Sequence, residues 1–143
     1  MSEDSYSIQG GCLCGQVRFE LTAPPIMASY CHCTRCQRRT GTAASAGVAV
    51  DPAAFRFLSG AELVRGWQPP DGMEKCFCGE CGAHLLSRAP NGSRVTIRMS
   101  AFDRDPGVRP SYRQFVAYAA SWEPIPDDGL PRYDGARPRA ASD

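Results

Sequence analysis

The chain has 143 residues, with 16 basic and 15 acidic side chains that leave a formal net charge of +1. This length suits one domain with a single modest core, and the near-neutral charge argues against a nucleic-acid or membrane partner, because binding to phosphates requires clustered positive charge. The N-terminal residues lack the charged and then apolar pattern of a secretion signal, and no apolar run approaches the roughly 20 residues that cross a bilayer. We therefore expect a cytoplasmic protein.

Short alternating runs of apolar and polar residues dominate the chain, which also contains 14 glycines and 12 prolines. Val17, Phe19 and Leu21 share one face of residues 16–22, which is the pattern of a half-buried strand. No segment keeps a helical period over a long stretch, so the sequence predicts an all-β fold. Further short strands are expected at residues 46–50, 55–58, 62–67, 84–87, 94–100 and 113–119.

A single helical turn is expected between two of these strands, at residues 51–55. Asp51 can cap this turn, and Pro52 suits its first position. One domain is expected over residues 1–132, because no change in composition marks a linker within them. The closing stretch, residues 133–143, has little apolar content, and we expect it to be a disordered tail.

The eight cysteines are concentrated in compact groups. Cytosolic thiols stay reduced, so metal ligation explains the grouping better than disulfides do. A C-x-x-C turn followed by glycine, or a C-x-C turn, brings two thiolates together on one zinc ion. The groups are Cys12 and Cys14 in "GGCLCG", Cys31, Cys33 and Cys36 in "CHCTRC", and Cys78 and Cys81 in "FCGECG", which Cys76 precedes.

The number of ligands divides the grouped cysteines between two sites. Structural zinc is closed by four ligands, whereas catalytic zinc keeps one position for water or substrate. The first and last groups together supply the four thiolates of a closed site, and the middle group supplies the three thiolates of an open one. Two closed sites, with Cys76 or His32 as the eighth ligand, are the main alternative; iron–sulfur ligation and disulfides are others.

Three residues near the motifs have simpler roles in the main interpretation. Cys76 is expected to be a small buried hydrophobe. His32 faces away from its two cysteine neighbours in an extended segment, so we expect it to lie outside the set of ligands. His84 lies on an apolar strand and is expected to be structural.

Three stretches, "GGCLCGQVRF", "CHCTRCQRRTG" and "KCFCGECGAHL", carry a family resemblance, with a weaker match at "SWEPIPDDGLPRYDG". They resemble the glutathione-dependent formaldehyde-activating enzymes and the related centromere protein V domains. The resemblance covers most of residues 8–135 and implies a β-tent fold of short antiparallel strands with zinc knuckles at the turns. It also implies two zinc ions per chain, a structural ion on Cys12, Cys14, Cys78 and Cys81 and a catalytic ion on Cys31, Cys33 and Cys36.

The activity implied by the resemblance is the addition of the glutathione thiol to formaldehyde or a related aldehyde, giving S-hydroxymethylglutathione. Formally this is a carbon–sulfur lyase reaction read in reverse. An open zinc site can hold a thiolate at neutral pH or polarise the aldehyde oxygen. Because three thiolates leave the site negatively charged, holding a thiolate is favoured over activating water. A non-catalytic zinc-binding interaction module is the alternative function.

Basic and aromatic residues are candidates for a binding pocket beyond the metal ligands. Arg35, Arg38 and Arg39 can offer charge to the carboxylates of glutathione, or can form a solvated basic turn. Four aromatic residues can line the pocket or pack in the core: Trp67, Tyr112, Phe115 and Trp122. The sequence leaves the oligomeric state open.

Overall fold

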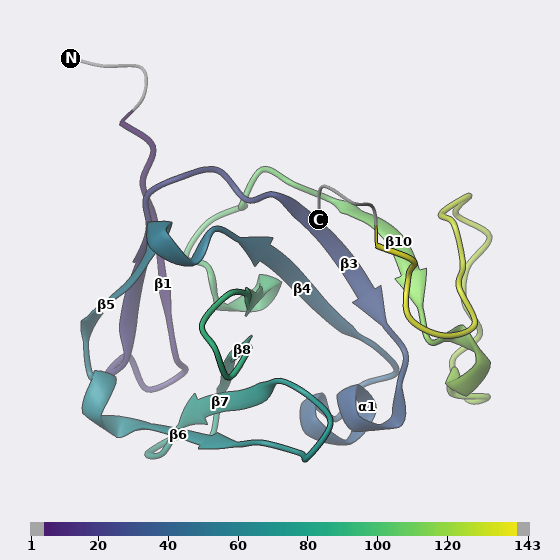
Figure 1. Cartoon of the computed structure of the whole chain (residues 1–143), viewed down its shortest axis with the longest axis horizontal. Helices are drawn as coiled ribbons and strands as arrows, with labels where there is room; N and C mark the ends of the chain where they lie inside the picture. Colours follow the sequence, from purple (N-terminus) through teal and green to yellow (C-terminus); the bar gives the residue numbers. More distant parts are fainter. Residues whose placement is uncertain (1–4, 140–143) are drawn as a thin grey trace.

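The computed structural model describes residues 5–139, which form short β-strands and one short α-helix at the edge of the molecule (Figure 1). The expected all-β class is therefore confirmed. No helix among these residues has the length and apolar character needed to cross a membrane. In chain order the elements are β1 (Ile8–Gly11), β2 (Arg18–Leu21), β3 (Met27–Cys31), α1 (Thr34–Thr40), β4 (Ser45–Val50), β5 (Phe55–Ser59), β6 (Val64–Trp67), β7 (Glu74–Cys78), β8 (His84–Arg88), β9 (Val95–Arg98) and β10 (Pro110–Gln114). Single turns of 3-10 helix lie at Pro52–Ala54, Ala61–Leu63, Met99–Ala101 and Val116–Tyr118.

The helical turn expected at 51–55 is present, and the Asp51 side chain accepts a hydrogen bond from the Ala53 N–H. The prediction of a strand at 113–119 is wrong beyond Gln114. Phe115 has a left-handed φ of 58°, which ends β10 and starts a 3-10 turn. Helix α1 was not expected, because its seven residues are too few to show a helical period.

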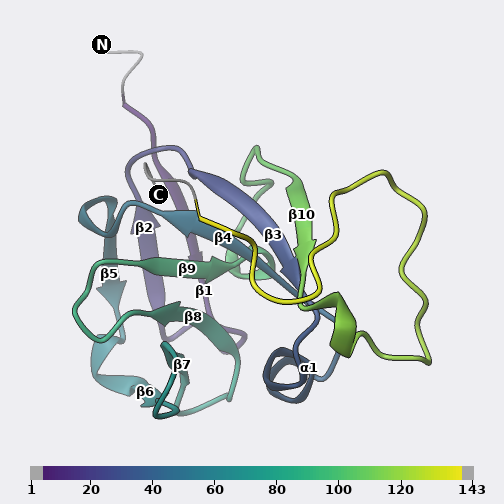
Figure 2. The same ribbon diagram turned by 45° about the vertical axis from the view of Figure 1, so that its right-hand side comes forward.

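The strands form two sheets (Figure 2). A three-stranded antiparallel sheet has the order β1-β2-β5, and a seven-stranded sheet has the order β10-β3-β4-β9-β8-β7-β6. All neighbours in the larger sheet are antiparallel except β10, which runs parallel to β3 at one edge. The expectation of antiparallel strands thus holds for every pair but this one.

One face of the seven-stranded sheet packs against the three-stranded sheet and forms the core. Successive side chains of a strand point to opposite faces, and the register places Val48, Ile97 and Leu86 side by side on the inner face. These residues are fully buried together with Phe19 and Leu21 of β2. The core therefore lies between the two sheets.

The opposite face of the larger sheet is polar, and α1 lies over part of it. Cys31 is paired with Ser45, Gly47 with Arg98, and Lys75 with Ser87 in the register of this face. Ser45, Ser87 and Arg98 are buried although they are polar. Burial of polar groups is costly unless they find partners, so this face is a candidate for a functional site.

The chain after β10 folds back along that strand. The Tyr133 N–H donates to the Arg113 carbonyl at 2.9 Å, and the Phe115 N–H donates to the Gly135 carbonyl at 2.9 Å. The Arg137 N–H donates to the side-chain oxygen of Gln114 at 3.1 Å. Contacts with the domain thus continue past residue 132, where the tail was expected to begin; residues 140–143 of that expected tail lie outside the described residues.

Replacement of Phe19 by alanine tests the core. The Phe19 ring is fully buried, with its centroid 5.5 Å from that of Phe55 and 5.6 Å from that of Phe102. We expect Phe19→Ala to lower the free energy of unfolding by about 3–5 kcal/mol, because it leaves a cavity between the sheets. Urea denaturation of the metal-loaded protein measures the loss. Leu58→Ala, at a 43% exposed position of the same sheet, is the control, and equal losses for both variants would contradict this core.

Candidate metal centres and the adjoining cleft

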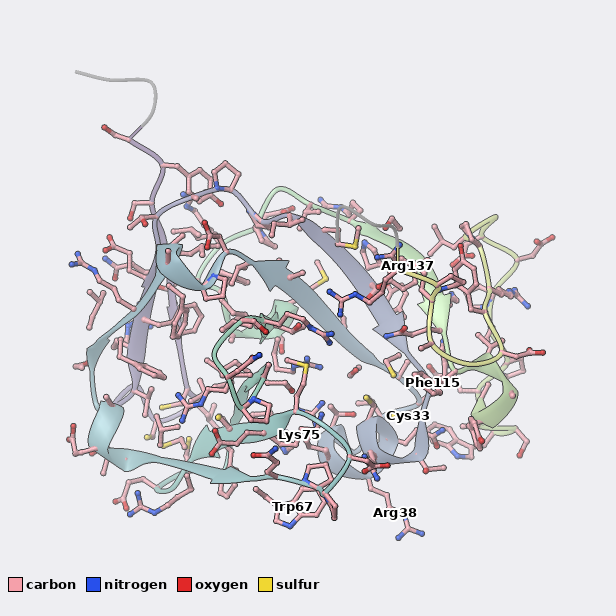
Figure 3. All side chains as sticks on the ribbon, viewed as in Figure 1. Cys33, Arg38, Trp67, Lys75, Phe115 and Arg137 are labelled. Atoms are coloured by element: carbon pink, nitrogen blue, oxygen red, sulfur yellow. The ribbon has the colours of Figure 1, made fainter. Side chains whose placement is uncertain are left out.

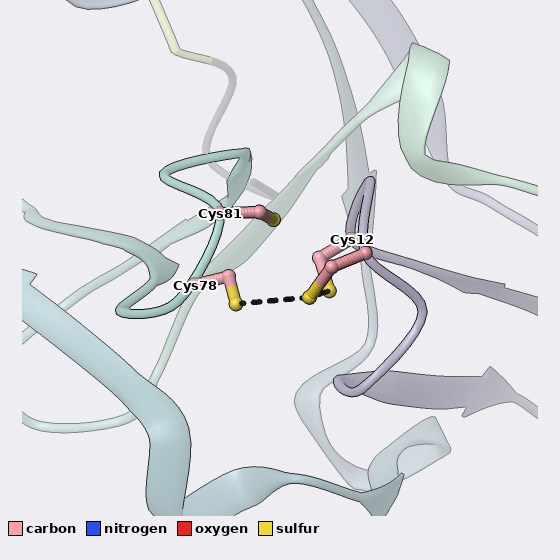
Figure 4. Close-up of side chains that lie close together, drawn as sticks. Cys12, Cys78 and Cys81 are labelled. Carbon is pink, nitrogen blue, oxygen red and sulfur yellow. Dashed lines mark hydrogen bonds between the residues drawn. The ribbon is translucent and has the colours of Figure 1, made fainter.

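The first cysteine cluster joins the β1–β2 turn to the β7–β8 turn (Figure 4). It consists of Cys12, Cys14, Cys78 and Cys81, whose Sγ atoms all lie within 4.8 Å of one another. Backbone amides support the sulfurs: the Val17 N–H donates to Cys12 Sγ at 3.3 Å, and the Glu80 N–H donates to Cys78 Sγ at 3.4 Å. Each turn closes through a glycine with positive φ, a conformation that glycine adopts without steric cost.

The spacing of these sulfurs is that of metal ligands. A zinc ion bound to four sulfurs at about 2.3 Å in a tetrahedron holds them about 3.8 Å apart. Cys12 Sγ lies 3.6 Å from Cys14 Sγ, which lies 3.9 Å from Cys78 Sγ. Hydrogen bonds from the backbone at Ala83 and Cys14 lower the pKa of Cys81 to about 6, so this thiol ionises readily. The cluster could hold a metal ion.

The second cysteine cluster lies where β3 passes into α1. Cys31 ends β3, Cys33 is the N-cap of α1, and Cys36 lies buried in the first turn. Their Sγ atoms also lie within 4.8 Å of one another. Cys33 Sγ accepts a hydrogen bond from the Cys36 N–H at 3.3 Å, so the cap of the helix and the cluster share one residue. Hydrogen bonds from Cys31 and Cys33 lower the pKa of Cys36.

No fourth His, Cys, Asp or Glu of residues 5–139 belongs to the second cluster. Cys76 is fully buried on the core face, where burial raises the pKa of its thiol to about 11. It therefore remains protonated and packs as a small apolar side chain. Since all eight cysteines are free thiols, disulfides do not explain the grouping.

His32 lies between two cysteines of the second cluster, but its ring contacts Arg113. His32 Nε2 lies 3.1 Å from Arg113 Nη1. A guanidinium only donates hydrogen bonds, so His32 Nε2 accepts, and burial followed by the Arg113 charge lowers the pKa of His32. Arg113 also pairs with Asp128 at 2.8 Å. The strand β10 and the segment after it thereby anchor the loop that carries the cysteines, a role that nothing in the sequence indicated.

A cleft of about 510 Å³ lies between α1 and the polar face of β6, β7 and β8. It is lined by Arg35, Arg38, Arg39, Trp67, Lys75, Phe77, Gly82 and His84. Figure 3 shows Trp67 and Lys75 on the β6–β7 side of this region, and Cys33 on the α1 side with Phe115 above it toward β10. The cleft combines four positive charges with two aromatic rings, which suits a ligand that carries carboxylates.

The cleft borders the second cluster through Arg39, whose Nη2 lies 3.9 Å from Cys36 Sγ. Arg35 is paired with Asp71 at 2.7 Å, so part of its charge is neutralised. Of the aromatic residues expected at a pocket, Trp67 lines the cleft, and Tyr112, Phe115 and Trp122 do not. Lys75 and Phe77 could not be identified from the sequence, because their place in the cleft depends on how β7 lies against α1.

The fold and the site define a β-sheet domain with two cysteine clusters, each able to hold a metal ion. The chain belongs to the family of glutathione-dependent formaldehyde-activating enzymes, whose model matches residues 7–118. A crystal structure of a Rhodobacter sphaeroides protein has a similar fold, with a TM-score of 0.56 and 22% sequence identity over 87% of this chain and 98% of that one. No curated protein shows a significant match to the sequence.

Serine substitutions distinguish the structural roles of the two clusters. We expect Cys78→Ser to destabilise the domain by several kcal/mol or to unfold it, because a metal ion bound between two turns contributes folding free energy. Cys33→Ser is expected to leave a folded protein with one metal ion fewer. Metal analysis and thermal unfolding measure both effects.

Cys76→Ala is the matched control, since this buried thiol belongs to neither cluster. It is expected to retain the full metal content with at most a small loss of stability. Identical unfolding of the Cys33 and Cys78 variants would show that the clusters do not differ in structural role.

Proposed function

We propose that the chain is a zinc-dependent cytoplasmic enzyme of the carbon–sulfur lyase class that adds the glutathione thiol to formaldehyde or a related aldehyde. Two zinc ions per chain are part of the proposal. Cys12, Cys14, Cys78 and Cys81 hold the structural ion, and Cys31, Cys33 and Cys36 hold the catalytic ion. Membership of the family supports glutathione-dependent activation of formaldehyde in general.

The position of the first cluster supports a structural role. Its ligands come from the turn that follows β1, in the small sheet, and from the end of β7 and the turn that follows it, in the large sheet. A metal ion there would link the two sheets through Cys14 and Cys78, which are 64 residues apart in the sequence. Four thiolates are also the full set of a closed structural zinc site.

The observation that carries the catalytic proposal is the position of the three-cysteine cluster beside the basic cleft. Three protein ligands are what catalytic zinc sites use. Bound there, zinc would hold a thiol as thiolate at neutral pH, where a free thiol of pKa about 8.5 is mostly protonated. In the reaction the sulfur–carbon bond forms, the carbonyl π bond breaks, and the proton lost by the thiol ends on the aldehyde oxygen.

The residues of the cleft would recognise the rest of the glutathione molecule. Lys75 and Arg38 lie on opposite walls, on β7 and α1, and neither has a carboxylate partner within salt-bridge distance among residues 5–139. They can therefore bind the two carboxylates of the tripeptide. Trp67 and Phe77 supply an apolar wall against which its methylene groups can pack.

The test is whether the zinc-loaded protein catalyses the reaction faster than it proceeds without enzyme. NMR measures the rate of exchange between 13C-formaldehyde and S-hydroxymethylglutathione at equilibrium. We expect Lys75→Met to raise KM for glutathione about tenfold with little change in kcat, because it removes one charge-assisted contact. Arg65→Met, at an exposed position of β6 outside the cleft, is the control. Exchange no faster than the uncatalysed rate in the wild-type protein would instead support a non-catalytic zinc module.

A further inference from the structure

Arg98 is a buried cation on the polar face of the larger sheet. Its side chain is 7% exposed, and its Nε and Nη1 atoms are buried without a hydrogen-bond partner. It lies opposite Gly47 in the register of β9 and β4, and a Cβ atom at Gly47 would lie 2.9 Å from Arg98 Nη2. The guanidinium thus lies over Gly47, on the face that also carries Ser45 and Cys31. The absence of a side chain at Gly47 provides the space for this arrangement.

Arg39 approaches the same cluster from α1. Its Nη2 lies 3.9 Å from Cys36 Sγ, its Nη1 donates to Ser87 Oγ at 3.3 Å, and its Nε is buried without a partner. Like Arg98, it has no carboxylate within salt-bridge distance among the residues described. Burial, together with the Arg39 charge, lowers the pKa of Arg98 to about 10.

Two like charges beside each other at low exposure are unfavourable unless negative charge lies nearby. The nearby groups that can supply it are the thiol of Cys36, whose Sγ lies 3.9 Å from Arg39 Nη2, and the thiol of Cys31, on the same face of the sheet as Arg98. Lys75, another cation on this face, is only half-buried and opens into the cleft, where water screens its charge. The geometry therefore couples the two arginines to the charge of the three-cysteine cluster.

We propose that Arg39 and Arg98 make the three-cysteine site selective for an anionic fourth ligand, a thiolate, over a neutral one; this inference rests on the proposed function. Three thiolates outweigh a divalent ion by one negative charge, and two guanidiniums turn this into one net positive charge. A thiolate ligand cancels that charge, whereas a neutral ligand leaves it in a poorly solvated region. The thiol proton is released to solvent on binding.

The test measures ligand binding to the full chain loaded with cobalt(II) in place of zinc. The probes are 2-mercaptoethanol, which binds as a thiolate and has no carboxylate for the cleft to recognise, and imidazole, which binds as a neutral ligand of similar size. Charge-transfer and d–d absorption bands report the two titrations at fixed pH. We expect Arg98→Met to weaken the affinity for 2-mercaptoethanol about tenfold and to change that for imidazole less than twofold.

Arg98→Lys, which keeps the charge, is the matched control and is expected to recover most of the thiol affinity. Arg39→Gln gives an independent measurement should Arg98→Met not fold, and it is expected to show the same selective loss. Equal weakening for both probes, or unchanged thiol affinity in both variants, would overturn the inference while the wild-type protein still binds thiol. A wild-type protein that binds neither probe would overturn the proposed function, and the inference with it.

Discussion

Side chains alternate between the two faces of the seven-stranded sheet, and this alternation positions both the core and the site. A single register gives the sheet two different faces. The inner face carries Val48, Leu86 and Ile97 into the core, and the outer face carries Ser45, Ser87 and Arg98 under α1. A slip of one residue would exchange the faces, so the packing that stabilises the fold also fixes where the polar groups of the site lie. Stability and site geometry are thus two results of the same strand pairing.

The two cysteine clusters relate to this sheet in different ways. The four-cysteine cluster lies at an end of the core, and its ligands come from both sheets. A bound metal ion would therefore link the two sheets. The three-cysteine cluster comes from a single stretch of six residues, in which the end of β3 and the N-cap of α1 arrange the sulfurs locally. That stretch is in turn held by contacts of His32 with Arg113 and of Gln37 with the His32 and Tyr118 carbonyls. The proposed catalytic site therefore combines a local ligand set with distant anchors.

The charges around the site fall into two classes. Arg35, Arg88 and Arg113 have carboxylate partners and are neutralised in pairs. Arg98 is buried and Arg39 is half-buried beside the thiols, and neither has a carboxylate within salt-bridge distance among residues 5–139. The paired arginines therefore support the fold, whereas Arg39 and Arg98 can interact with the cluster and its ligands. This division of charges also explains how an overall charge of +1 coexists with a strongly basic cleft, because acidic residues elsewhere on the chain balance the local excess.

The all-β class, most of the strands and the composition of both cysteine clusters could be predicted from the amino-acid sequence. Strand alternation and ligand spacing are local properties, visible within a few residues. The number of ligands in a closed site favoured grouping the turns at Cys12 and Cys78 but left two closed sites as an alternative, and the structure brings these two turns together. The sequence did not reveal α1, because the helix has only seven residues and its cap is a cysteine. The tertiary structure alone decided the placement of His32 against Arg113, of Lys75 and Phe77 in the cleft, and of Arg98 over Gly47. These contacts depend on the register and packing of strands that are distant in the chain, and no local pattern encodes that register.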